Sequence, residues 1–80
     1  MTGFEQIKAV VTEYQKKVDR HFQDYSRRVE RARQRYSDEA FREESRKIWI
    51  DVGSKVDVAR GIAKNEIDLI VEDIEKDFQK

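Results

Sequence analysis

Few residues of this chain could carry out catalysis or bind a metal. A single histidine, His21, has Asp24 and Tyr25 one helical turn further along, and there is no cysteine. Helical di-metal sites pair a glutamate with a histidine three residues later, but Val18 occupies that position here. Glycine-rich phosphate loops and nucleophile elbows are also missing from the sequence. We therefore predict no catalytic, cofactor-binding or metal-binding residue, no small-molecule substrate and a structural role for His21.

Arginine is the residue type with the clearest spatial pattern. At about 100° per residue in an α-helix, five arginines share one face, with only Asp24 among them. Such a strip can follow a phosphate backbone, with binding that weakens as the salt concentration rises. It can equally form a solvated outer face, or face acidic residues of a second chain. Nucleic-acid binding is thus the alternative function, through a strip that consists of Arg20, Arg27, Arg28, Arg31 and Arg35.

The second half of the chain has more large apolar residues than one partner helix can cover. Trp49 sits in "IWI" (48–50), three large apolar residues in a row that a one-sided helix cannot bury. The main apolar line of this half consists of Ile48, Val52, Val56 and Ala59, and a second line beside it includes Val58 and Ile62. Because a second hairpin could cover both lines, we expect a homodimeric four-helix bundle with Trp49 as a central anchor. A partly exposed Trp49 on a monomeric hairpin is the alternative. The predicted interface consists of Trp49, Ile50, Val52, Val56, Val58, Ile62 and Leu69.

Composition restricts the chain to a small protein. Its 80 residues make a single domain, and domains of this size seldom have a core that is stable without association or a staple. Since cysteine is absent, disulfides are excluded. No apolar run exceeds three residues, which predicts neither a transmembrane segment nor a signal peptide. We expect a soluble, cytoplasmic protein that does not bind membranes.

The net charge is zero, but the two halves of the chain differ. Residues 1–36 have nine Lys or Arg against five Asp or Glu, whereas residues 37–80 have eight against twelve. Complementary halves favour self-association over a general attraction to nucleic acid.

Helices must position all these residues. Thr2 and Glu5 form a T-x-x-E capping box, which predicts that a helix begins at Gly3. From there to residue 36, apolar residues recur every three or four positions, as is typical of an amphipathic helix. The first helix is therefore expected over about 3–36.

The stretch "RQRYSDEAFREES" (33–45) interrupts this pattern. Ser37 is a good N-cap, the two acidic residues after it suit a helix start, and the arginines before it suit a helix end. The apolar register also slips by five residues, from Tyr36 to Phe41. These signals predict a turn near 36–38. Because no glycine or proline marks it, one uninterrupted helical rod is the alternative.

The second helix is expected over about 38–78. Gly53 and Gly61 lie within it, each at a cost of about 1 kcal/mol relative to alanine. The apolar positions continue in phase through both, so a kink near residue 53 is the most that we expect. The two glycines mark either a close approach of another helix or tolerated surface positions. The predicted fold class is all-α: a long, two-helix antiparallel hairpin that dimerises into a four-helix bundle.

The stretch "YSDEAFREESRK" (36–47) resembles the helical hairpins of small phage-encoded proteins, in which Tyr-Ser or Tyr-Thr before acidic residues often starts the second helix. The resemblance implies a phage or prophage origin and a role as assembly scaffold, adaptor or modulator of a host factor. It assigns no functional residue. The sequence therefore predicts a non-enzymatic protein–protein interaction module that associates with itself, as a structural or assembly component or a small regulator, and that binds an unidentified protein partner.

Overall fold

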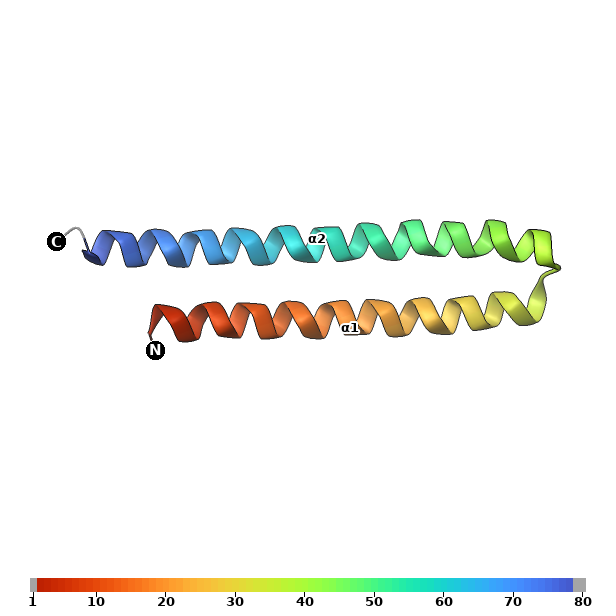
Figure 1. Cartoon of the computed structure of the whole chain (residues 1–80), viewed down its shortest axis with the longest axis horizontal. Helices are drawn as coiled ribbons and strands as arrows, with labels where there is room; N and C mark the ends of the chain where they lie inside the picture. The colour runs from red at the N-terminus through yellow and green to blue at the C-terminus, as the bar shows by residue number, and fades with distance from the viewer. Residues whose placement is uncertain (1, 79–80) are drawn as a thin grey trace.

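Two long helices pack side by side as an extended antiparallel hairpin (Figure 1). The computed structural model describes residues 2–78, with α1 over Gly3–Arg35 and α2 over Asp38–Phe78. The hairpin measures 65 × 17 × 9 Å. The prediction of an all-α hairpin that turns near 36–38 is confirmed, and the alternative of an uninterrupted rod is wrong.

The start of α1 follows from its first residues. The Thr2 hydroxyl accepts a hydrogen bond from the Glu5 backbone N–H (3.2 Å), and the Thr2 carbonyl accepts one from Gln6 (3.1 Å). The first bond satisfies an N–H group that the first turn of a helix leaves free, and the second is the first backbone bond of the helix. At the same end, α1 approaches α2 closely, because a Cβ atom on Gly3 would collide with the Ile74 side chain.

The turn between the helices is made without glycine. Tyr36 has an extended backbone (φ −116°, ψ 152°), and its N–H donates to the Ala32 carbonyl (3.0 Å). The Phe41 N–H donates to the Ser37 carbonyl (2.7 Å), which begins the hydrogen bonding of α2. Among the described residues, none has a positive φ. An extended residue therefore reverses the chain where a left-handed glycine is often used, and it accounts for the five-residue slip in register.

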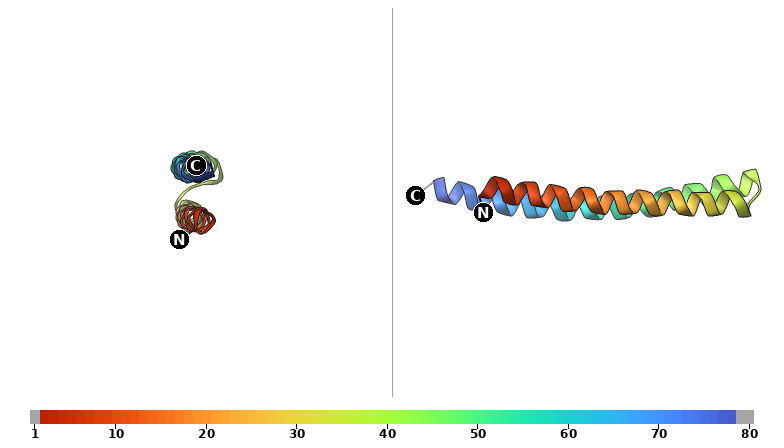
Figure 2. Two further views of the ribbon diagram at one scale, coloured as in Figure 1. Left: turned by 90° about the vertical axis from the view of Figure 1, so that its left-hand side faces the viewer. Right: turned by 90° about the horizontal axis from the view of Figure 1, so that it is seen from below.

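The core is a thin layer between the helices, nearest the turn. Ala32, Ile48 and Val52 form its buried centre, and partly buried Tyr25, Val29, Phe41 and Val56 pack against them. Because only two helices are present, each buries one stripe and leaves the rest of its surface exposed. Seen end on, the hairpin is a single layer of two helices with a broad face on either side (Figure 2).

The second helix runs without interruption through both of its glycines. A Cβ atom on Gly53 or Gly61 would meet nothing within 4 Å. Neither glycine therefore lies where α1 and α2 pack together, and both leave open space on the outside of the hairpin. Within residues 2–78, no helix has a stretch long and apolar enough to cross a membrane.

Candidate interaction surfaces

Large apolar side chains remain exposed along much of α2. Trp49 is 55% exposed, Val58 64% and Leu69 62%. An isolated exposed apolar residue is ordinary on a protein surface, but rows of them mark interaction sites. Many exposed apolar residues on an extended hairpin thus suggest an interaction surface.

The exposed residues of α2 fall on two opposite sides of the hairpin. The core line of α2 runs through Ile48, Val52 and Ala59. At about 100° per residue, Trp49 lies about 80° to one side of this line and Val58 about 100° to the other. One flat interface cannot include both residues.

The first side is the aliphatic flank, which we define by Val58, Ile62 and Leu69. Val58 and Ile62 line a groove of about 370 Å³ between the helices, with Lys17 and His21 on the α1 side. Toward the open end of the hairpin, Ile62 and Tyr14 line a second groove of about 150 Å³. An apolar floor bordered by Lys17, Asp51 and Lys55 is suited to a protein surface that has charges of both signs.

His21 therefore lies at the edge of an apolar groove. Within the described part of the chain, no three His, Asp or Glu side chains gather as metal ligands would. The groove brings His21 near Lys17, Asp51 and Lys55. Ser54 also lines this groove, but its hydroxyl donates to the Ile50 carbonyl of the same helix (2.9 Å). The groove therefore offers mainly contact area and charge.

The opposite side is the tryptophan flank, which follows one face of α2 at spacings of three, four or seven residues. Its members are Arg42, Arg46, Trp49, Gly53, Arg60 and Lys64. The Trp49 ring packs edge-on against Tyr25 of α1, with ring centroids 5.4 Å apart and planes at 72°. Further along this side, Val11 of α1 and Ile67 of α2 line an apolar groove of about 350 Å³.

The predicted interface residues thus occupy three different environments. Val52 is 1% exposed and belongs to the core between α1 and α2, and Val56 packs against it. α1 therefore covers Val52 fully and Val56 in part. Ile50 is 59% exposed and points away from α1, about 180° from the core line. The remaining residues divide between the aliphatic flank and Trp49.

The predicted arginine strip is not a row of equivalent cations. Arg28 Nη1 donates to Asp51 Oδ2 of α2 (2.6 Å) and lies 3.6 Å from Asp24 Oδ2. Arg27 also pairs with Asp24, at 3.9 Å. Arg28 therefore joins the two helices at the edge of the aliphatic flank and does not point outward with Arg20.

The contact between Arg28 and Asp51 shifts the pKa values of both side chains in the directions expected for an ion pair. The hydrogen bond from Arg28 lowers the pKa of Asp51 below its ordinary value, and Lys55 Nζ, 3.4 Å from Asp51 Oδ2, lowers it further. The same hydrogen bond raises the pKa of Arg28. Both groups are thus held in their charged forms.

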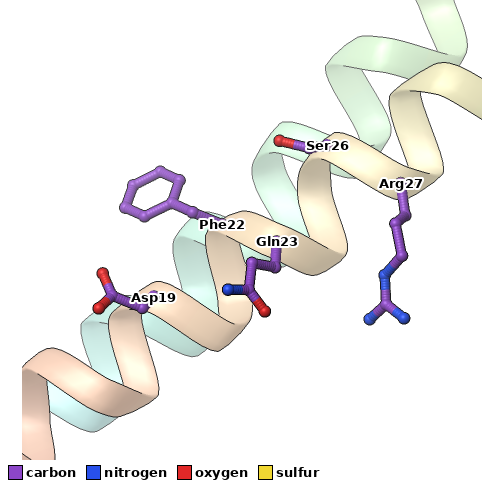
Figure 3. Close-up of a pocket in the computed structure, with 5 residues that line it drawn as sticks. All are labelled: Asp19, Phe22, Gln23, Ser26 and Arg27. Carbon is purple, nitrogen blue, oxygen red and sulfur yellow. The ribbon is translucent and has the colours of Figure 1, made fainter.

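Figure 3 shows a shallow depression on the outside of α1. Its lining residues all come from this one helix: Asp19, Phe22, Gln23, Ser26 and Arg27. Their side chains point in different directions from the helix and do not converge on a common point (Figure 3). The depression therefore lacks the convergent groups that a catalytic or ligand site requires.

Sequence reasoning missed the division of the exposed residues between two flanks and the contact between Arg28 and Asp51. A helical wheel contains a signal for both. Arg28 lies only about 40° from the buried Ala32, and Trp49 and Val58 fall on opposite sides of the α2 core line.

Comparisons with protein-family models, curated proteins and solved structures find no match.

Proposed function

We propose that this protein is a non-enzymatic interaction module that associates with itself through the aliphatic flank, as a structural or assembly component or a small regulator. The observation that carries the proposal is the unpartnered line of Val58, Ile62 and Leu69, with Ile62 45% exposed over an apolar groove. Removing such a line from water is the main driving force for helical bundles to form.

The positions of charged residues favour an antiparallel second copy. If Val58 of one chain lies beside the partner's Leu69, Lys55 lies near the partner's Asp73, because Lys55 precedes Val58 by three residues and Asp73 follows Leu69 by four. Each such exposed pair contributes only about 0–1 kcal/mol, so the pairs select orientation while the aliphatic residues supply affinity. In the parallel arrangement, the arginine-rich ends of the two chains would lie side by side.

Nucleic-acid binding through the arginine strip is the weaker candidate. Asp24 lies within 4 Å of both Arg27 and Arg28, and Arg28 is also bonded to Asp51. A phosphate backbone would have to compete with these carboxylates. We therefore place self-association first.

Ile62→Glu tests the proposal. A glutamate in the middle of the aliphatic flank would bring a charge into the apolar contact between two chains, which is unfavourable. We expect the variant to remain helical by circular dichroism and to have the mass of one chain by light scattering, under conditions where the wild type has the mass of two.

Ile50→Glu is the matched control, because Ile50 has a similar exposure on the outer face of α2. This variant should keep the mass of the wild type. A wild-type protein that is helical and monomeric at high concentration in low salt would disprove self-association. Loss of association in both variants would place the interface elsewhere.

A further inference from the structure

The tryptophan flank has a different chemistry from the aliphatic flank. Arg42, Arg46, Arg60 and Lys64 are exposed along it, and they precede or follow Trp49 at helical spacing. Arg60 bonds Asp57 (2.8 Å), but both side chains are more than two-thirds exposed, so this pair is weak and exchangeable. With Asp57 included, four cations stand against one carboxylate, so the flank carries a net positive charge around Trp49.

Between these cations the surface is hollow and apolar. Arg60 and Lys64 stand at the rim of the groove whose floor includes Val11, Ala63 and Ile67. Closer to the turn, Gly53 leaves open space next to the exposed ring of Trp49, since nothing lies within 4 Å of where its Cβ would be. The flank thus offers one apolar groove bordered by Arg60 and Lys64 and, nearer the turn, open space beside Trp49.

From these observations we propose that the tryptophan flank binds an acidic amphipathic helix of another protein. Helices dock in grooves by placing apolar side chains on the floor and their charges against the rim. Acidic residues on such a helix would complement the four cations, and an apolar side chain would enter the space above Gly53. From Arg42 to Lys64 the flank is about 33 Å long, room for about six turns of partner helix.

Other ligand classes fit the flank less well. Single-stranded nucleic acid stacks its bases on successive aromatic faces, whereas the groove beyond Trp49 is lined mainly by aliphatic residues, Val11, Ala63 and Ile67, with Tyr14 at its edge. A membrane surface takes up large, protruding apolar residues, but Ala63 and Ile67 are recessed between the helices. The aliphatic groove and its cationic rim together favour a helix.

Trp49 reports occupancy of its own flank, because the chain has no other tryptophan. The probe is a synthetic, tryptophan-free helical peptide with leucine at every third or fourth position and glutamate at most others. Titrated into the full-length protein in low salt, it should shift the fluorescence of Trp49 to the blue in a saturable manner. A peptide in which lysine replaces each glutamate should not do so.

Two variants locate the binding site. Arg60→Glu with Lys64→Glu should weaken binding by about tenfold or more, since it reverses the charge of the rim. Arg20→Glu with Arg31→Glu, which changes the net charge equally at two exposed positions of α1 away from the tryptophan flank, should change the affinity less than twofold. If the Arg20 and Arg31 variant loses as much affinity for the peptide, the attraction is not specific to the flank and the proposal is wrong.

Gly53→Gln tests the open space beside Trp49 without damaging the fold. Glutamine is a better helix former than glycine, and its Cβ meets no neighbour at this position, but its side chain takes up the space beside Trp49. The substitution should weaken binding of the peptide several-fold, whereas Gly61→Gln on the outer face of α2 should leave this binding unchanged. No saturable shift up to millimolar peptide, or tighter binding of oligodeoxythymidine or phosphatidylserine vesicles than of the peptide, would overturn the proposal.

Discussion

At the residue scale, the contact between Arg28 and Asp51 joins the two helices. Arg28 is about one-third exposed and Asp51 about half, so solvent screens their attraction. The contact lies next to the buried core of Ile48 and Val52, which packs between α1 and α2. It also borders the aliphatic flank, where it would orient a second chain.

The lowered pKa of Asp51 makes stability depend on pH. Because the carboxylate is favoured in the folded state, its contribution is fully present above the ordinary pKa of 3.8 and is lost as pH falls through the lower folded value. We expect the denaturation midpoint to fall as pH drops from about 5 to about 2. Asp51→Asn should flatten this dependence. An unchanged slope in the variant would show that other carboxylates are responsible.

Sequence alone was informative about which residues are buried and less so about what they face. The spacing of apolar residues correctly identified the core stripe of both helices, because burial follows the helical period. It assigned Val52 to an interface between chains, whereas this residue is covered by α1. Sequence spacing states that a residue is on an apolar face, but only the packed hairpin shows how much of that face one neighbouring helix covers.

At the scale of elements, the helix ends were predictable and the turn was less so. Capping by Thr2 was expected from the T-x-x-E motif and is confirmed. The boundary at 36–38 was also expected, but the lack of glycine left an uninterrupted helix as an alternative. The extended conformation of Tyr36 removes that objection, since a residue of any type can adopt it.

The glycines of the two helices have different surroundings, which predicts different responses to alanine. Gly61→Ala should raise the free energy of unfolding by about 1 kcal/mol, because the new methyl group meets open space and alanine favours the helix. Gly3→Ala should give no such gain, because its Cβ would displace the Ile74 side chain. Chemical denaturation of both variants measures the difference. Equal gains would mean that the helices are not in close contact at Gly3.

At the scale of the whole molecule, two helices make a layer that cannot cover its own apolar surface. The hairpin is 65 Å long and 9 Å across its shortest dimension, so both broad faces remain open. The aliphatic flank, with charges of both signs around it, is suited to a second copy, and the tryptophan flank, with its excess of cations, to an acidic partner. Under this account, the protein links copies of itself to another protein.

The most direct test of self-association is the distance between spin labels in two copies. Since the chain has no cysteine, Gln34→Cys places a single nitroxide near the turn, on an exposed position of α1. Tyr14 lies opposite Ile62 and Ala63, near the midpoint of the antiparallel bundle. Gln34 is about 20 residues from this midpoint, so two labels should lie about 60 Å apart at 1.5 Å per residue.

Pulsed electron paramagnetic resonance measures this distance. A peak near 60 Å that disappears with Ile62→Glu and persists with Ile50→Glu is the result that we predict. A peak below about 30 Å would show that the two chains associate with their turns at the same end. No coupling between labels at high protein concentration would show that the chain stays monomeric, and would contradict the proposal that the aliphatic flank binds a second copy.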